Sequence, residues 1–289
     1  MNSTFFITAF IFISFLLSSC ALNEDQKVDP KIYLQSLDIS IGKNRIPFYI
    51  KRSDGSFVSE DPSLLSVIYY KKDDDAKLNA KNTKWRNFPL KSGIYVSDME
   101  FDSTGIWIVE VLFSEIKNPM KGQLIVKPKT DSPNIGTSAP KVKTKIINDS
   151  NSIETITSDI NPDPKLYEIS LDRALEKNIP ILINLSTPGY CRSATCGPQT
   201  KILSNLIKDY ESDKIIFIHI EIFDNPQEMK KSGDPSIGIQ STQVTEWKIT
   251  TEPWTFLINN RGVIVERYEG FVSFEELQED ISNLLKSAN

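Results

Sequence analysis

The stretch ILINLSTPGYCRSATCGP, positions 181–198, decides the fold of the C-terminal half of the chain. It begins with the short apolar run 181–185, bounded by turn-forming residues, which is typical of a buried β-strand. Pro198 is favoured in the first turn of a helix, and apolar residues at helical spacing follow it. Cys191 and Cys196 therefore lie where a strand passes into a helix.

The chain has three cysteines, and export accounts for Cys20, so Cys191 and Cys196 form the remaining pair. Thiol–disulfide exchange needs a thiolate, and the unpaired N–H groups and dipole of a helix N-terminus stabilise one. We therefore predict a catalytic pair. We expect Cys191 to be the exposed attacking thiol and Cys196 its resolving partner, because a cysteine in the loop before the helix is easier to reach. Two alternatives remain: a non-catalytic surface binding module whose disulfide only pins the loop, and a copper site that adds His219.

The composition excludes several classes of protein. A chain of 289 residues predicts about two domains. Its 39% apolar and 25% charged residues are ordinary for a globular protein. The net charge of −5 is mild, with both signs interspersed, so no nucleic-acid partner is expected. No cofactor and no metal are expected either.

The N-terminus predicts export from the cytoplasm. Residues 5–17 form an apolar run that is short for a membrane span and ends in Leu-Ser-Ser-Cys. This end resembles the lipobox of bacterial lipoproteins, in which the cysteine, here Cys20, becomes lipidated. The first four residues depart from that pattern because they carry no Lys or Arg. A plain secretory signal or a short anchor helix are the alternatives. We expect a signal peptide at 1–20, a polar tether at 21–30, and a lipid-anchored protein on the outer side of a bacterial membrane, at the cell surface or in the periplasm.

Residues 31–128 predict an all-β domain. Short strand-like runs alternate with turn formers, and residues 107–111 alternate in strand fashion, with Glu110 on the polar face. This size and pattern favour an antiparallel, immunoglobulin-like sandwich. We expect residues 93–101 and 105–113 to pair as a hairpin. Residues 129–164 are rich in turn formers and proline, and predict a linker.

Residues 165–289 predict a layered α/β domain, with helices and strands in the order α, β, α, β, then β, β, α. The two adjacent strands flank a hairpin turn at 259–262. No cysteine and no histidine lie in the β-domain, so the candidate chemistry belongs to this second domain.

This domain resembles the thioredoxin superfamily over nearly its whole length. The strand, loop and cysteine pair match that family's redox motif, and Thr251-Glu252-Pro253 resembles its threonine–proline step, which is cis and faces the redox pair. The resemblance implies a thiol–disulfide oxidoreductase that exchanges disulfides with protein partners. An extended partner segment would pair as an added strand beside Tyr190, Glu252, Pro253 and Trp254.

The chain departs from the family in two ways. Four residues separate the cysteines instead of two, and Cys196-Gly197-Pro198 also resembles the surroundings of the family's nucleophile. Asn184 stands where many thioredoxins have a buried aspartate, so Glu221 on the next strand is the candidate for proton transfer. His219 lies on the same face of that strand and is more simply a hydrogen-bonded core residue. The whole layout resembles bacterial lipoproteins with an immunoglobulin-like domain before a thioredoxin-like domain.

Overall fold

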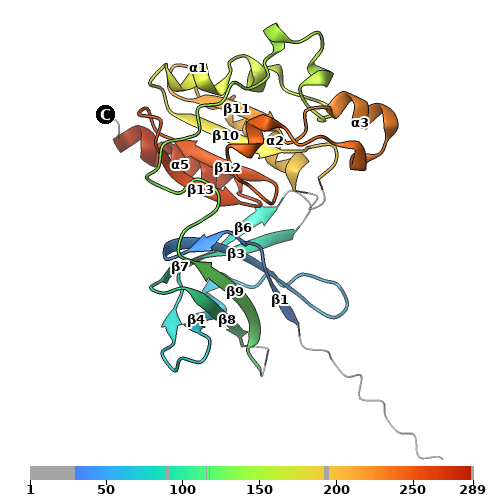
Figure 1. Cartoon of the computed structure of the whole chain (residues 1–289). Helices are drawn as coiled ribbons and strands as arrows, with labels where there is room; N and C mark the ends of the chain where they lie inside the picture. Colours follow the sequence, from blue (N-terminus) through green and yellow to red (C-terminus); the bar gives the residue numbers. More distant parts are fainter. Residues whose placement is uncertain (1–29, 89–91, 115, 117, 192–194, 288–289) are drawn as a thin grey trace, which may run out of the picture.

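The structure is a computed structural model that describes residues 30–88, 92–114, 116, 118–191 and 195–287. The predicted signal peptide, with Cys20, and residues 21–29 of the predicted tether lie outside these residues. Within the described part of the chain, no helix has the length and apolar composition needed to cross a bilayer. An all-β domain and a layered α/β domain lie one above the other (Figure 1).

The N-terminal domain is built from two β-sheets that face each other across one core. One sheet has the strand order β1–β3–β7–β6, and the other has the order β2–β9–β8–β4–β5. Phe48, Phe101 and Trp107 come from different strands of both sheets and share this core. A 3-10 helix, η1, spans Pro62–Leu64. The strands are β1 (Lys31–Leu34), β2 (Ile39–Ser40), β3 (Gly42–Lys51), β4 (Leu65–Lys71), β5 (Leu78–Asn79), β6 (Lys81–Phe88), β7 (Ser92–Phe101), β8 (Gly105–Phe113) and β9 (Met120–Lys127).

The predicted hairpin between β7 and β8 is wrong. β7 pairs with β3 and β6, whereas β8 pairs with β4 and β9 in the facing sheet. Phe101 ends β7 and Trp107 lies in β8, and their ring centroids are 5.0 Å apart in the shared core. Both rings are buried between the sheets, so the short connection crosses from one sheet to the other instead of folding back within one. The partner that replaces β8 is β6, whose polar sequence the strand pattern did not reveal.

The C-terminal domain is a mixed sheet with helices on both faces, in the strand order β11–β10–β12–β13. β10 and β11 are parallel, and β12 and β13 run antiparallel to their neighbours. α2 and α5 pack in the core on one face, and α1 and α4 pack in the core on the other. The elements are η2 (Ile147–Asp149), η3 (Ile153–Thr155), η4 (Pro164–Tyr167), α1 (Leu171–Leu175), β10 (Ile181–Ser186), α2 (Cys196–Leu206), β11 (Ile216–Glu221), α3 (Pro226–Ser232), η5 (Pro235–Ile237), α4 (Thr242–Thr245), β12 (Trp254–Ile258), β13 (Ile264–Glu269) and α5 (Phe274–Ser287).

Residues 129–164, predicted as a linker, pack along the C-terminal domain. Ser138 forms a β-bridge with Val263, and the Leu171 N–H donates to Thr144 Oγ1 at 3.1 Å. Ile156 is 3% exposed and joins the core beneath α2 and α5. The segment carries enough apolar surface to be buried, so it forms one wall of the second domain instead of a free extended tether.

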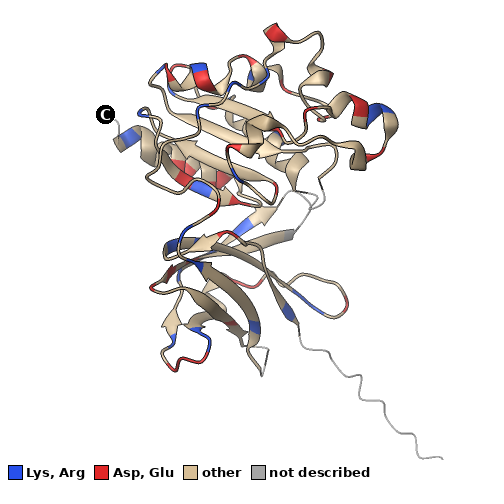
Figure 2. Cartoon of the chain, in the orientation of Figure 1, with Lys and Arg blue, Asp and Glu red and all other residues tan. Residues whose placement is uncertain are grey.

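Charged side chains join the two domains. Arg45 of β3 donates to both carboxylate oxygens of Glu276 in α5, at 2.6 and 2.8 Å, and to the Phe271 carbonyl oxygen at 3.1 Å. Arg267 of β13 donates to the Asp38 carboxylate at 2.8 Å. Residues of both signs follow the boundary between the domains in Figure 2. The paired geometry holds the sandwich against β13 and α5 in one orientation.

Replacing Arg45 should destabilise the protein because it removes both short hydrogen bonds to the buried Glu276 carboxylate and leaves it the more distant Arg86, at 3.8 Å. The side chains of Arg45 and Glu276 are 13% and 8% exposed. Breaking a buried pair by removing one partner costs about 3 to 5 kcal/mol. We expect Arg45→Met to lower the apparent free energy of unfolding by about 3 kcal/mol in urea titrations.

The matched control is Lys84→Met, which breaks an exposed ion pair of the same interface, with Glu279 at 3.5 Å. Exposed pairs contribute about 0 to 1 kcal/mol, so this variant should unfold nearly as the parent does. Equal losses in the two variants would contradict a buried, structure-determining role for Arg45.

Candidate active site

Cys191 and Cys196 form a disulfide at the start of α2, with their Cα atoms 5.8 Å apart. Cys196 is the first residue of the helix and is buried, while Cys191 ends the preceding loop and is half-buried. Pro198 lies in the first turn of the helix, as predicted. The sulfur of Cys191 is therefore the more accessible of the two, and the sulfur of Cys196 lies at the positive end of the helix.

The loop before the disulfide is held by the 129–164 segment. The N–H of Gly189 donates to Ser158 Oγ at 3.0 Å. A Cβ atom at Gly189 would lie 2.5 Å from the Ser158 carbonyl oxygen, so the close approach requires glycine. Ser158 Oγ in turn donates to the Glu221 carboxylate at 2.8 Å. A buried acid thus positions the loop that carries Cys191.

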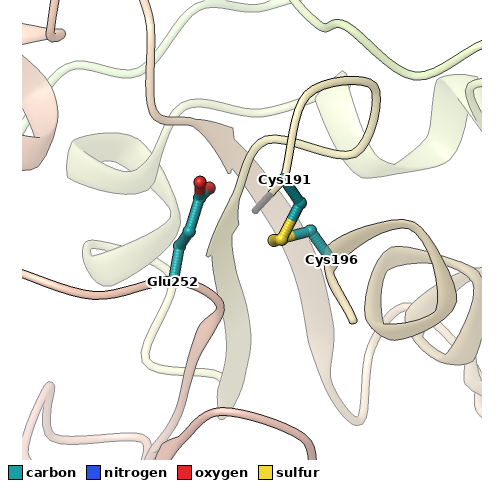
Figure 3. A group of neighbouring side chains, drawn as sticks. All are labelled: Cys191, Cys196 and Glu252. Atoms are coloured by element: carbon teal, nitrogen blue, oxygen red, sulfur yellow. A yellow bond between two sulfur atoms is a disulfide. The ribbon is translucent and has the colours of Figure 1, made fainter. Parts of the chain in front are cut away.

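The peptide bond between Glu252 and Pro253 is cis, as the resemblance to thioredoxins implied. Pro253 is buried at the entry to β12, directly beside the strand that leads to the disulfide. The Glu252 carboxylate accepts from the Thr187 N–H at 2.9 Å. One of its oxygens and the two cysteine sulfurs all lie within 4.8 Å of one another (Figure 3).

The sequence predicted a backbone role for Glu252 and did not assign its side chain. A signal was present, because a residue that precedes a cis-proline facing the redox pair also places its side chain near that pair. Glu221, the predicted proton-transfer residue, is not part of this group of neighbouring side chains. Its carboxylate accepts instead from the N–H groups of Ser158, at 2.7 Å, and Ile222, at 3.1 Å.

Burial shifts two titrating groups of β11 in opposite directions. Burial raises the pKa of Glu221 to about 7, although hydrogen bonds from Ser158 oppose the shift. Burial lowers the pKa of His219 to about 4. The His219 ring is hydrogen-bonded to Tyr167 Oη at 2.8 Å and to Ser186 Oγ at 3.0 Å, so it is a satisfied core residue, as predicted.

His219 does not lie with the cysteines. Among the described residues, the side chain that joins the two sulfurs within metal-ligand reach is Glu252. The fold therefore does not bring His219 to the two cysteines as a copper site would require. The His219 ring faces the interior and is hydrogen-bonded to Ser186 at the end of β10.

Asn184 ties β10 to the cis-proline strand. Its amide donates to the Trp254 carbonyl oxygen at 3.0 Å and to Thr255 Oγ1 at 3.2 Å, and its Oδ1 accepts from Ser186 Oγ at 2.7 Å. A carboxylate has no donor for the first two contacts. The position expected to hold a proton acceptor therefore serves as a buried bridge between strands.

The predicted partner-binding residues differ in exposure. Tyr190 is half-buried next to Cys191. Trp254, expected to contact a partner, is 2% exposed, and Arg267 lies over its ring at 4.9 Å. Its Nε1 donates to Thr251 Oγ1 at 3.0 Å. Trp254 is therefore a support beneath the cis-proline loop, because it packs with Trp247 and Phe256 in the core of its own domain.

The strand order, the cis-proline and the disulfide at the start of α2 give this domain the thioredoxin-like fold that the resemblance implied. No protein-family model and no curated protein match the sequence. Among solved structures, a thioredoxin-family thiol:disulfide interchange protein from Chlorobium tepidum is 14% identical, with a TM-score of 0.35, and the match covers 53% of this chain and 99% of that one. A thiol-disulfide oxidoreductase from Bacteroides fragilis is 18% identical, with a TM-score of 0.32, over 51% and 99% of the two chains. The Lin-41 filamin domain is 13% identical, with a TM-score of 0.24, over 34% and 92%.

The opposite shifts of Glu221 and His219 predict compensating effects of pH on stability. The pKa of Glu221 rises from 4.5 to about 7 on folding, so its ionisation lowers the stability of the protein as pH rises through that window. The pKa of His219 falls from 6.5 to about 4 on folding, so its protonation lowers the stability of the protein as pH falls through that window. The free energy of unfolding of Glu221→Gln, taken relative to the parent, should therefore rise by up to about 3 kcal/mol as pH increases from 4.5 to 7, measured by urea unfolding.

The companion variant, His219→Gln, should change relative to the parent in the opposite direction, with its gain appearing as the pH falls from 6.5 to 4. A difference between Glu221→Gln and the parent that stays constant from pH 4 to 8 would show that this carboxyl group titrates normally.

Proposed function

We propose that this chain is an extracytoplasmic thiol–disulfide oxidoreductase that acts on protein clients through Cys191 and Cys196. The observation that carries the proposal is the geometry of the pair. An accessible sulfur and a buried sulfur at a helix N-terminus form a disulfide beside a cis-proline and a carboxylate. Such a site favours one cysteine as the attacking thiol and the other as its resolving partner.

The reaction conserves electrons and protons. The Cys191 thiol gives up its proton and attacks one sulfur of a client disulfide as the thiolate, so that a Cys191–client bond forms while the client S–S bond breaks. The other client sulfur leaves as a thiolate and takes up a proton. Cys196 then loses its proton and attacks the Cys191 sulfur, which closes the Cys191–Cys196 disulfide and releases the second client thiol. The client gains two electrons and two protons, which the pair loses, and oxidation of a client runs the same steps in reverse.

Two carboxylates have separate roles in this proposal. Glu252 lies beside both sulfurs, where its oxygen accepts the proton that leaves a cysteine. Glu221 is a positioning residue, because its contact with Ser158 holds the loop that ends in Cys191. The backbone at Glu252 and Pro253, flanked by Tyr190, pairs with an extended client segment.

The remaining parts of the proposal concern the rest of the chain. Residues 1–20 direct export, and Cys20 carries a lipid that holds the protein at the outer side of a bacterial membrane. Residues 31–128 form an immunoglobulin-like domain, residues 129–164 connect it, and residues 165–289 form the redox domain. The support for the anchor is the apolar run that ends in Leu-Ser-Ser-Cys, and the support for the immunoglobulin-like domain is its pair of facing sheets.

Serine variants should separate the roles of the two cysteines. In Cys196→Ser, a client attached to Cys191 cannot be released by internal attack, so mixed disulfides should accumulate. In Cys191→Ser they should not, because the remaining thiol is buried. Non-reducing gels of cells that express each variant measure this, with the double serine variant as background. The reverse pattern would exchange the two roles.

The reduction potential tests whether the disulfide is catalytic or structural. Structural disulfides of exported proteins have potentials below about −300 mV, and exchanging pairs lie above this value. We expect the potential of the Cys191–Cys196 pair to lie well above it, measured by equilibration with dithiothreitol redox buffers. A value below it would mean that the bond only pins the loop.

Substitution of Glu252 should change the reactivity of the reduced pair. The Glu252 carboxylate lies within 4.8 Å of both sulfurs, so it disfavours the negative charge of a thiolate there. In Glu252→Gln, the midpoint of iodoacetamide alkylation against pH should therefore move about 1 unit lower. Glu221→Gln is the matched control and should move the midpoint less. A larger shift of the midpoint in Glu221→Gln than in Glu252→Gln would identify Glu221 as the proton acceptor.

A further inference from the structure

A hollow of about 460 Å³ is lined by residues of both domains and reaches Thr195 and Glu252, which flank the disulfide. The N-terminal domain contributes Tyr49, Phe57 and Phe88, and the C-terminal domain contributes Thr195 and Glu252 among others. Thr195 directly precedes Cys196 in the chain, and Glu252 lies beside both sulfurs. The volume falls within the roughly 300 to 1,000 Å³ that is typical of ligand clefts. Neither domain alone forms this hollow.

The wall of the hollow is aromatic and continues onto the surface of the N-terminal domain. The rings of Tyr33 and Tyr49 are stacked at 4.9 Å, and Phe57 meets Tyr49 edge-on at 5.4 Å. Tyr33 is 40% exposed and Phe57 is 43% exposed. Three rings at these spacings cover about 10 Å, which is the length of about three residues of extended chain. This aromatic row therefore fits a linear ligand longer than the hollow itself.

The floor of the hollow is made where the domains meet. Phe88 of β6 and Phe271 pack edge-to-face at 4.6 Å across the boundary. Beside them, the Glu269 carboxylate accepts from the backbone N–H groups of Leu37, at 2.7 Å, and Asp38, at 2.9 Å. These contacts fix the aromatic row at a set distance from the cis-proline loop, so the hollow is preformed.

We propose, on the basis of the oxidoreductase function proposed above, that this hollow binds an extended segment of a client protein that has an aromatic side chain near its reacting cysteine. The client cysteine lies at the Cys191 sulfur and the client backbone lies beside Pro253. The aromatic side chain lies against Tyr49 and Phe57, because such pairs prefer stacked or edge-on packing. Glu252 disfavours acidic residues next to the client cysteine, so the segment is neutral or basic there.

The experiment uses the reduced full-length protein and synthetic ten-residue peptides whose single cysteine carries a thionitrobenzoate leaving group. Cys191 attacks the peptide sulfur, the peptide becomes disulfide-linked to Cys191, and coloured thionitrobenzoate is released. One peptide has a phenylalanine three residues from the cysteine, a second has alanine there, and a third has aspartate beside the cysteine. Ellman's reagent, which has no peptide, reports the chemistry of the pair alone.

The parent protein should react about tenfold faster with the phenylalanine peptide than with the alanine peptide, and most slowly with the aspartate peptide. Y49A/F57A should lose this advantage while its rate with Ellman's reagent stays within about twofold of the parent. The single variant Phe57→Ala, at an exposed position, keeps the test valid if the double variant unfolds. Leu112→Ala is the matched control, because it removes an exposed apolar side chain from the other sheet and should change nothing.

Three results would overturn the inference. If Y49A/F57A loses rate equally with the phenylalanine and the alanine peptide, the rings do not select the client side chain. If Y49A/F57A reacts with every peptide at the rate of the parent, clients bind elsewhere. A parent dimer that becomes monomeric in Phe57→Ala with unchanged peptide rates would assign the aromatic row to a second copy of the chain. Failure of the parent to react with Ellman's reagent would instead refute the oxidoreductase function, so the two failures are distinguishable.

Discussion

The carboxylate of Glu269, at the end of β13, joins the parts of the molecule that must act together. One oxygen accepts from Thr251 Oγ1 at 2.7 Å, and the other accepts from the Leu37 and Asp38 N–H groups. Thr251 also accepts from Trp254, so the loop before the cis-proline is held from both sides. Because these donors come from two domains, this one buried carboxylate links the N-terminal sandwich directly to the loop before the cis-proline.

The disulfide depends on a second set of contacts that come from the other direction. Ser158, in the segment between the domains, links the Gly189 backbone to the Glu221 carboxylate. The two acids near the pair thus differ in what surrounds them: Glu221 is saturated by donors inside the protein, whereas Glu252 reaches the sulfurs. Their environments, and not their residue type, make Glu221 the acid that holds the loop and Glu252 the acid that lies beside the two sulfurs.

Much of the C-terminal domain was predictable because its signals are local. The apolar run of β10, Pro198 in the first turn of α2 and the hairpin turn before β13 each depend on residues close in sequence. The N-terminal domain was predicted less well. β6 has little apolar alternation, and the connection from β7 to β8 is short enough for a hairpin but crosses between sheets. Which strands pair there depends on which rings share the core, and no local pattern encodes that choice.

By itself, the sequence determined that a cysteine pair lies between a strand and a helix, that a proline step opens a later strand, and that an all-β domain precedes an α/β domain, because each of these features depends on residues that are close together in the chain. Only the tertiary structure decided that Glu252 and not Glu221 reaches the sulfurs, that Trp254 is buried, and that aromatic residues of one domain line a hollow with Thr195 and Glu252 of the other. Those outcomes depend on contacts between residues far apart in the chain, whose distances are set by the packing of one whole domain against another.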